Sequence, residues 1–307
     1  MDIRFWGVRG SYPVAGPNTI RYGGNTSCVE VRLDDGTLII LDAGSGLRAL
    51  GERMMASEFG EGRGQATFLI SHTHWDHIMG LPFFAPAKVA GNEFVVYGRR
   101  RDKGPSLERL FSYQQSREHF DTPFEEFAAR FTFREIVEGD VLAAGSATIT
   151  CTLLNHPGYA LGYRIAADGA ALVYVADTSP FDEVLLEDSF VAGPKDATPE
   201  PNSPRRRRLA AMKQRWLALL AGADLVIYDT FFEPASFVVR PHWGHSTPLH
   251  ATEACVAAGA KRLALFHHAP DNSDKTMDQL QETYRRQAAA CGLEVFAAAE
   301  GLEVRLP

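Results

Sequence analysis

Three histidines and an aspartate fall within one short stretch of the chain, residues 71–77. His72, His74, Asp76 and His77 follow an apolar run at 66–70 that predicts a buried strand. Imidazole nitrogen and carboxylate oxygen are the donors that hold zinc and related divalent ions. The spacing therefore predicts a metal site in the loop at the carboxyl end of this strand.

Three later residues of the same chemical types, His156, Asp177 and His267, also come where predicted strands end. Because strand ends at one edge of an α/β sheet converge on a common cleft, we expect these side chains to meet the 71–77 loop. The full set exceeds one tetrahedral site and suits two ions a few ångströms apart. The candidates are His72, His74, Asp76, His77, His156, Asp177 and His267.

Asp177 is the candidate bridging ligand, because a carboxylate directs two oxygens at different ions and an imidazole does not. Two divalent ions would lower the pKa of a shared water, make hydroxide available near neutral pH and neutralise charge on a phosphoryl or carbonyl oxygen. The donor set therefore predicts hydrolysis. Zn²⁺ is the expected metal, but these ligands also admit Mn²⁺, Fe²⁺ or Ni²⁺.

Another carboxylate, Asp42, closes the apolar strand predicted at 37–41 and opens a glycine-rich turn at 43–46. Two roles are open for it. It either caps the helix that follows, or it accepts a hydrogen bond from a metal-binding histidine and orients that ring. A second choice is also open at the last ligand position, where His268 directly follows His267.

The elements that position these residues alternate between strands and helices, which predicts an α/β fold. Thr247 and Pro248 suit the N-cap and first position of a helix. The strand, hairpin and helix order recurs in both halves, as in a pseudo-symmetric sandwich. Strands are predicted at 3–6, 27–33, 37–41, 66–70, 94–97, 132–136, 147–154, 162–166, 171–176, 223–228 and 263–266, and helices at 47–59, 205–221 and 276–291.

Two segments are predicted to be insertions in a single domain that spans residues 1–307. Residues 99–131 are charged and amphipathic, and they predict one or two helices outside the sheet core, either a lid over a pocket or ordinary surface helices. Residues 192–208 begin as a loop rich in proline and polar residues. They end in four arginines at 205–208, which form either a solvated helix face or a patch that attracts a phosphate-bearing substrate.

Composition limits the class of protein further. The 307 residues carry a net charge of −7, which disfavours a general nucleic-acid-binding protein. No apolar run is long enough to cross a membrane and the N-terminus lacks a signal-peptide core, so we expect no membrane partner and a cytoplasmic location. Four scattered cysteines without a C-x-x-C pair predict reduced thiols. A homodimer is left open.

The ligand residues, together with the Asp-Ala-Gly-Ser-Gly turn at 42–46, make nearly the whole chain resemble the metallo-β-lactamase superfamily. That resemblance implies a four-layer αββα sandwich with a dinuclear site at one edge. It favours His267 over His268, because the apolar run before His267 is similar to the family's last ligand strand. It implies that the first ion is held by His72, His74 and His156, the second by Asp76, His77 and His267, and that Asp177 bridges them.

Three further motifs resemble the phosphodiesterase branch, which includes tRNase Z and the cyclic-phosphate phosphodiesterases of phosphonate metabolism. They are Gly-Val-Arg-Gly-Ser at 7–11, Arg-Tyr-Gly-Gly-Asn-Thr-Ser at 21–27 and Gly-His-Ser-Thr at 244–247. The resemblance implies that His245 contacts the phosphate or protonates the leaving oxygen. Its place before a predicted helix agrees with this role, since a helix N-terminus favours an anion.

Two departures from this branch are visible. The tRNase Z family inserts a long tRNA-gripping arm between its third ligand histidine and its bridging aspartate, whereas His156 and Asp177 are only 21 positions apart here. Pre-tRNA is therefore disfavoured as a substrate. The phosphonate-pathway enzymes carry a cysteine-rich zinc site near the N-terminus, and this chain has only Cys28 there, so we expect no such structural metal.

The sequence thus predicts a dinuclear metal-dependent hydrolase that cleaves a small phosphodiester, a cyclic one included, with Asp76 helping to hold or deprotonate the water. The alternative is a carbonyl hydrolase such as a lactonase or thioesterase, because hydroxide attacks either centre. The Gly-His-Ser-Thr segment argues against that alternative. A tRNA 3′-processing nuclease and a non-enzymatic sensor are less favoured.

Overall fold

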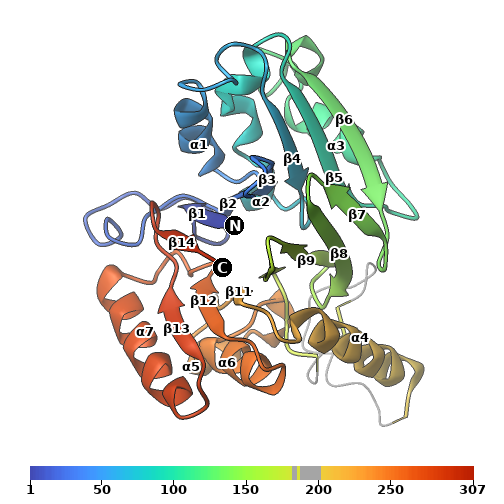
Figure 1. Cartoon of the computed structure of the whole chain (residues 1–307). Helices are drawn as coiled ribbons and strands as arrows, with labels where there is room; N and C mark the ends of the chain where they lie inside the picture. Colours follow the sequence, from blue (N-terminus) through green and yellow to red (C-terminus); the bar gives the residue numbers. More distant parts are fainter. Residues whose placement is uncertain (182–184, 187–201) are drawn as a thin grey trace.

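Two seven-stranded mixed sheets lie face to face in the computed structural model, which describes residues 1–181, 185, 186 and 202–307 (Figure 1). In spatial order, the first sheet contains β14 (Glu303–Arg305), β1 (Asp2–Gly7), β2 (Cys28–Arg32), β3 (Leu38–Leu41), β4 (Gln65–Leu69), β5 (Glu93–Arg99) and β6 (Arg130–Ile136). The second contains β13 (Glu294–Ala297), β12 (Arg262–Phe266), β11 (Leu225–Asp229), β10 (Ala170–Val175), β9 (Ala160–Ala167), β8 (Ala147–Leu154) and β7 (Val141–Ala144).

Helices cover the outer face of each sheet. Those on the first sheet are α1 (Leu47–Met54) and α3 (Leu107–Gln114), and those on the second are α4 (Pro204–Leu220), α6 (Pro248–Ala257) and α7 (Asp274–Ala289). Short helical turns complete the described part: α2 (Trp75–Ile78), η1 (Leu81–Phe83), η2 (Ala85–Lys88), η3 (Phe124–Glu126), α5 (Pro234–Phe237) and η4 (Pro241–Trp243). The expected four-layer αββα sandwich is confirmed.

Strand direction explains why polar residues gather at one edge of this sandwich. In the first sheet β3, β4 and β5 are parallel, and in the second β10, β11 and β12 are parallel. β8 and β10 both run antiparallel to β9, so β8 points the same way as β10. Every residue of β10 and β11 is buried, as expected for central strands covered on both faces. Polar side chains are therefore expected where these strands end.

The sequence placed most strands and two of the three bounded helices correctly, and it overestimated the length of the first helix. The helix predicted at 47–59 ends at Met54, and Phe59 instead packs its ring against Phe94 with centroids 6.1 Å apart. In the segment 99–131 only α3 and η3 are helical, and Leu107 and Phe111 are buried against the first sheet. The prediction that these helices lie outside the core was therefore wrong, because their apolar side chains cover a sheet face.

Of the second predicted insertion, 192–208, residues 192–201 lie outside the part of the chain that the structure describes. Its basic end belongs to α4, whose N-cap Ser203 accepts a hydrogen bond from the Arg206 N–H at 3.1 Å. The predicted start of α6 is also confirmed, since the Thr247 hydroxyl accepts from the His250 N–H at 3.3 Å. Both helices begin where a side-chain oxygen replaces the missing backbone partner.

Arg9, in the turn at 7–11, is completely buried and ties two loops together. Its Nε donates to the Gly23 carbonyl at 2.8 Å, and its Nη1 donates to the carbonyls of Asn272 at 2.7 Å and Ala269 at 3.1 Å. The loop before β2 is thereby joined to the segment after β12. Both segments border the polar edge of the sandwich.

Replacing Arg9 by leucine is expected to lower the free energy of unfolding by about 3 kcal/mol or more, because buried carbonyls lose their donors at ~1–3 kcal/mol each. Urea denaturation followed by tryptophan fluorescence measures the change. Arg286→Gln is the control, since its pair with Glu282 on α7 is exposed and should contribute less than ~0.5 kcal/mol. Equal midpoints for the two variants would contradict the anchoring role.

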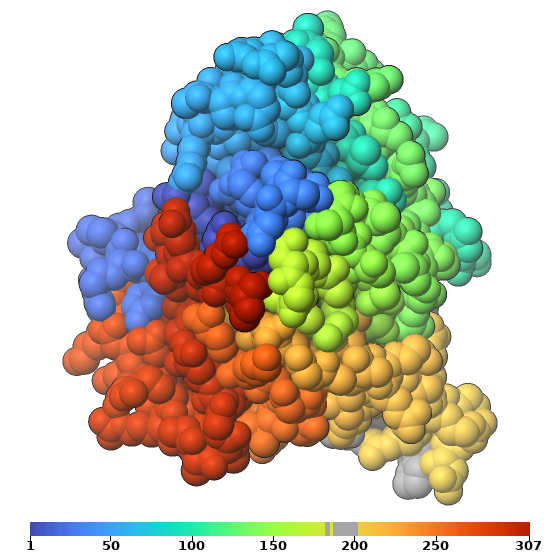
Figure 2. Space-filling model, viewed as in Figure 1, coloured from blue at the N-terminus to red at the C-terminus, as the bar shows by residue number. Residues whose placement is uncertain are grey.

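The two ends of the chain lie side by side. β14 pairs with β1 in register Ile3–Val304, and the last residues fill the seam between the two halves (Figure 2). The halves also share one hydrophobic cluster that contains side chains from both sheets. Within residues 1–181, 185, 186 and 202–307, no helix combines the length and hydropathy that a membrane span requires.

Candidate metal centre

The ligand candidates converge at one edge of the sandwich, where strands of both sheets end. Those of the first sheet follow β4, and those of the second follow β8, β10 and β12. All are buried except His74. The structure brings together each residue that the sequence proposed as a ligand: His72, His74, Asp76, His77, His156, Asp177 and His267.

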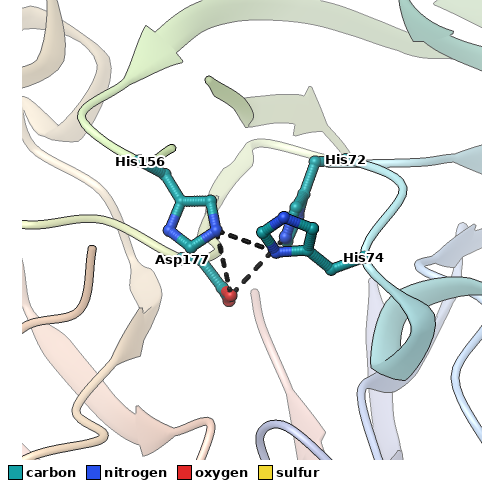
Figure 3. A group of neighbouring side chains, drawn as sticks. All are labelled: His72, His74, His156 and Asp177. Carbon is teal, nitrogen blue, oxygen red and sulfur yellow. Dashed lines mark hydrogen bonds and ion pairs between the residues drawn. The ribbon is translucent and has the colours of Figure 1, made fainter. Parts of the chain in front are cut away.

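One group of donors surrounds Oδ2 of Asp177 (Figure 3). His72 Nε2 lies 3.6 Å and His156 Nε2 lies 3.7 Å from this oxygen. His74 completes the group, with its Nδ1 3.1 Å from His156 Nε2. The four donor atoms lie within 4.8 Å of one another, so one ion can contact them all.

A second group faces the other oxygen of the same carboxylate. His77 Nε2 and His267 Nε2 each lie 3.2 Å from Asp177 Oδ1. Asp76 Oδ2 lies 3.3 Å from His77 Nε2 and 3.1 Å from His267 Nε2. Asp177 therefore stands between the two groups with one oxygen toward each, which is the placement that a bridging ligand needs.

The hydrogen bonds of the outer ring nitrogens test whether cations fit between these groups. His77 Nδ1 donates to Asp42 Oδ2 at 2.7 Å, and His156 Nδ1 donates to the Gly244 carbonyl at 2.8 Å. In a neutral ring the opposite nitrogen, Nε2, then carries a lone pair. These lone pairs face other ring nitrogens and carboxylate oxygens. A cation between these atoms would be a partner for all of them. His72 Nε2 and Asp177 Oδ1 are buried and make no hydrogen bond with the described residues.

The charge of the centre favours the same interpretation. Burial disfavours a charged His77, but neighbouring carboxylates raise its pKa well above the usual value; they belong to Asp177, Asp76 and Asp42. At His156, burial dominates and lowers the pKa to about 3, so this ring is neutral, as a metal ligand must be. The centre therefore attracts positive charge and offers neutral imidazoles, and divalent cations match both properties.

Asp42 orients the loop that carries four of the candidates. Its Oδ1 accepts the Ser71 N–H at 2.7 Å, and its Oδ2 accepts from the Ser71 hydroxyl, His77 Nδ1 and the Tyr174 hydroxyl at 2.8, 2.7 and 2.6 Å. It does not cap α1, whose N-cap is Gly46. Of the two roles left open, these contacts match the orienting one.

Asp42→Asn is expected to weaken metal binding by roughly 10- to 100-fold, the usual effect of losing the partner of a ligand histidine. The amide offers a donor where His77 and Tyr174 need an acceptor. Competition with a chromophoric chelator measures the affinity. Tyr174→Phe removes only one of the hydrogen bonds and should have a smaller effect; metal affinity unchanged in Asp42→Asn would show that the loop is positioned without it.

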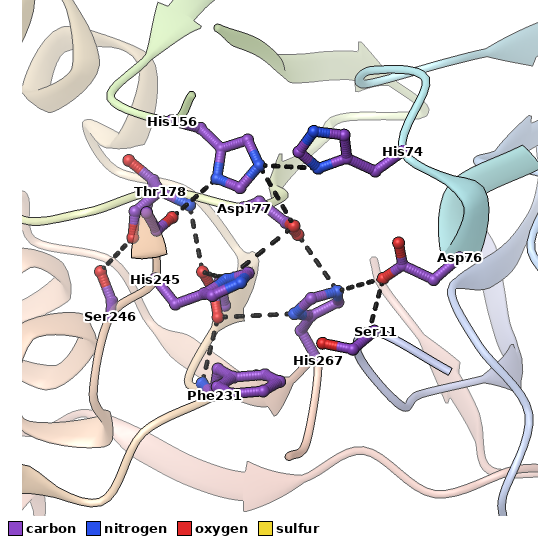
Figure 4. A network of polar contacts seen from close by, with 12 residues as sticks. Ser11, His74, Asp76, His156, Asp177, Thr178, Phe231, His245, Ser246 and His267 are labelled. Atoms are coloured by element: carbon purple, nitrogen blue, oxygen red, sulfur yellow. Dashed lines mark hydrogen bonds and ion pairs between the residues drawn. The ribbon is translucent and has the colours of Figure 1, made fainter. Parts of the chain in front are cut away.

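The turn at 7–11 closes over the second group (Figure 4). The Ser11 N–H donates to Asp76 Oδ2 at 2.8 Å. Gly10 passes directly beside His267: a Cβ placed there would lie 2.5 Å from Cε1 of that ring. This motif therefore works through its backbone, with an amide for Asp76 and an absent side chain for His267.

Gly10→Ala should displace the His267 ring and lower the metal content of the purified protein, most strongly at the second ion. Metal per chain, measured by mass spectrometry of the dialysed protein, reports the loss. Ser11→Ala is the matched control, because it keeps the N–H that Asp76 accepts. Full metal content in Gly10→Ala would mean that the turn can shift away without cost.

His245 lies against this centre on the opposite side from the 71–77 loop. Its Nδ1 is 3.0 Å from Asp229 Oδ2 and 3.8 Å from Asp177 Oδ2. The ring stacks on Phe231 with centroids 4.6 Å apart. Burial lowers the pKa of a histidine, but Asp229 and Asp177 together raise that of His245 to about 9. The imidazole is thus held in place and favoured in its protonated form.

Asp229 is a site residue to which the sequence analysis gave no role. It ends β11, and it also accepts the N–H groups of Thr178 and Phe231, each at 3.0 Å. The signal that could have found it is the one that found Asp177, a carboxylate directly after an apolar strand. Asp177, Asp229, His245 and His267 form a third possible ligand group, but it shares two members with the second group and is an alternative to it.

His268, the competing ligand candidate, points away from the centre. Its Nε2 donates to the Ala298 carbonyl at 2.8 Å, and its ring makes an edge contact with Tyr22. His267 contacts the carboxylates of Asp76 and Asp177, and its backbone is left-handed, with φ of 59°. This conformation is uncommon for a residue with a side chain and often marks a functional position.

Comparison with known proteins identifies the class that this fold and centre define. Residues 37–191, half of the chain, match the family described as the beta-lactamase superfamily domain. The chain therefore belongs to the beta-lactamase superfamily, and its sandwich and donor set are of the metallo-β-lactamase type. It is a metal-dependent hydrolase.

Its relatives lie in the nuclease and phosphodiesterase branch. Ribonuclease Z of Streptococcus sanguinis is 26% identical over 265 residues, covering 77% of this chain and 81% of the relative. The short form of human tRNase Z superimposes with a TM-score of 0.64 at 20% identity, covering both chains completely. A diphosphatase from the PhnP family superimposes with a TM-score of 0.63 at 18% identity, covering 100% of this chain and 98% of the other.

Proposed function

We propose that this protein is a dinuclear metal-dependent phosphodiesterase that acts on a small phosphodiester. The observation that carries the proposal is the position of Asp177, with one oxygen toward each histidine group and His245 beside it. Two divalent cations held there would make hydroxide available at neutral pH and offset charge on a phosphoryl group. Zn²⁺ suits the donors, as do Mn²⁺, Fe²⁺ and Ni²⁺.

The chain's own residues divide the remaining work. His72, His74 and His156 would hold the first ion, and Asp76, His77 and His267 the second. Asp76 would also accept a hydrogen bond from the attacking water. His245 would donate a proton from Nε2 to the leaving oxygen, because its Nδ1 is engaged by Asp229. It precedes α6, whose N-terminal N–H groups favour the phosphate charge.

Pre-tRNA is the second candidate substrate, and the named relatives favour it. Ribonuclease Z and tRNase Z are similar over most of this chain, so the expectation from the sequence that tRNA is disfavoured gains no support from them. The observation against tRNA is structural: only the β9–β10 hairpin separates His156 from Asp177. A carbonyl hydrolase would use the same metal centre. It would not need a proton donor that is positioned to act on a phosphate ester, which is the role proposed for His245.

Hydrolysis of bis(p-nitrophenyl) phosphate by the zinc- or manganese-loaded protein tests the proposal. Release of p-nitrophenolate that disappears after chelation and returns with metal is expected. Parallel assays with a lactone, a thioester and a pre-tRNA test the alternatives. Turnover of a lactone or thioester without turnover of the phosphodiester would overturn the proposal, and efficient 3′-processing of pre-tRNA would replace the small substrate by RNA.

A further inference from the structure

A cavity of about 540 Å³ opens beside His72 and His74. Its walls come from two chain segments that the centre itself does not use. One is the end of β5 and the residues that follow it, with Arg99, Arg101 and Lys103, and the other is the turn after His156. The volume is in the range that holds a nucleotide-sized ligand.

The charges that line this cavity favour an anion. Among the described residues that line it, three have cationic side chains, Arg99, Arg101 and Lys103, and one has a carboxylate, Asp102. A second cavity, of about 370 Å³, lies near Ser11 and has the opposite balance. It is lined by the two carboxylates of Glu233 and Asp271 against one arginine, with aromatic rings between them. Of these two cavities, the one beside His72 therefore suits a phosphoryl group better.

Tyr159 connects this cavity to the metal ligands. It is buried, its backbone is left-handed with φ of 57°, and its N–H donates to the His156 carbonyl at 2.8 Å. The guanidinium groups of Arg99 and Arg208 lie 5.5 and 5.1 Å from the centre of its ring. A left-handed backbone at a residue with a side chain costs of order 1–3 kcal/mol and persists where the surroundings impose it. Here it places an aromatic ring near two cations and close to the ligand His156.

Arg101 is joined to the ligand loop from the other wall. Its Nη2 donates to the Thr73 hydroxyl at 2.5 Å, and Thr73 lies between His72 and His74. The cation is therefore held next to the first ligand group rather than at a distance from it. A guanidinium presents several N–H donors in one plane, which matches the oxygens of a phosphate.

We propose that this cavity binds a second phosphoryl group of the substrate, one that is not cleaved. This inference rests on the proposed function and names its substrate class, a nucleotide-sized phosphodiester that carries a further phosphate. Arg99, Arg101 and Lys103 bind the additional phosphate while the scissile phosphodiester lies at Asp177. The segment 99–103 is then a specificity element.

Binding of two thymidine nucleotides to the zinc-loaded protein tests this assignment without turnover. Thymidine 3′,5′-bisphosphate should bind about 10- to 100-fold more tightly than thymidine 5′-monophosphate by calorimetry, the range expected for added charge-assisted hydrogen bonds. Arg101→Gln should remove most of that difference. Arg117→Gln is the matched control, because this exposed arginine belongs to the same 99–131 segment, pairs with Glu126 and lies outside the cavity.

The results separate this inference from the proposed function. Hydrolysis of bis(p-nitrophenyl) phosphate with equal affinity for the two nucleotides would overturn the cavity assignment and leave the phosphodiesterase standing. Preference for the bisphosphate without any phosphodiester hydrolysis would support the cavity and overturn the reaction. Equal weakening of both nucleotides by Arg101→Gln would reduce Arg101 to a structural role, and tighter binding of a single-stranded oligonucleotide than of the bisphosphate would overturn the small-molecule class.

Discussion

Asp177→Asn should lower kcat/KM toward bis(p-nitrophenyl) phosphate by more than about 100-fold, beyond the range for a residue that only supports a ligand. An asparagine side chain keeps one oxygen and replaces the other by an amide that cannot bind a cation. One histidine group would then lose its shared oxygen, either that of His72 and His156 or that of His77 and His267. Metal per chain is expected to fall with activity.

Two measurements separate this result from misfolding. The metal-free variant should give the same far-ultraviolet circular dichroism spectrum as the metal-free parent, and its thermal midpoint should fall, because Asp177 offsets the positive charge that the raised pKa values of His77 and His245 favour. Asp121→Asn, an exposed carboxylate in the 99–131 segment, is the control and should keep both activity and metal. An Asp177→Asn protein that retained its full metal content and activity would refute the bridging assignment.

His245→Ala should reduce kcat by about 10²- to 10⁴-fold for a substrate with an alkoxide leaving group, the usual effect of losing a general acid. The loss should be much smaller for bis(p-nitrophenyl) phosphate, since p-nitrophenolate departs without a proton. Metal content should stay at the parental level, because His245 is not among the ligands of the two groups around Asp177. Because both substrates are measured on the same variant, a loss of folded protein would lower both rates equally and would not change their ratio.

The same comparison decides between the two roles that the resemblance left open for His245. An equal loss for both leaving groups would mean that the imidazole binds the phosphate and does not protonate the leaving oxygen. Asp229→Asn should show the same dependence on leaving group with a smaller loss, because it only orients Nδ1 at 3.0 Å. If Asp229→Asn added its full effect to that of His245→Ala, the two residues would act separately and the pairing would be wrong.

Most of the fold could be predicted from local patterns. The runs predicted at 37–41 and 171–176 are apolar apart from Thr37, and they correspond to β3 (Leu38–Leu41) and β10 (Ala170–Val175), in which every residue is buried. Helix starts at Ser203 and Thr247 follow from side-chain caps within three residues. Predictions failed where a distant contact overrode the local pattern, as at Phe59, whose packing on Phe94 ends α1 early.

Within the site, the sequence determined which residues are chemically able to bind metal and that they follow strands, because both properties are local. Only the tertiary structure decided how they face one another. His267 Nε2 and Asp76 Oδ2 lie 3.1 Å apart although 191 positions separate them, whereas the adjacent His268 donates to the Ala298 carbonyl instead. Asp229 and the absent side chain of Gly10 matter for the same reason. Such contacts arise from the packing of two sheets, and no neighbouring residue in the chain encodes them.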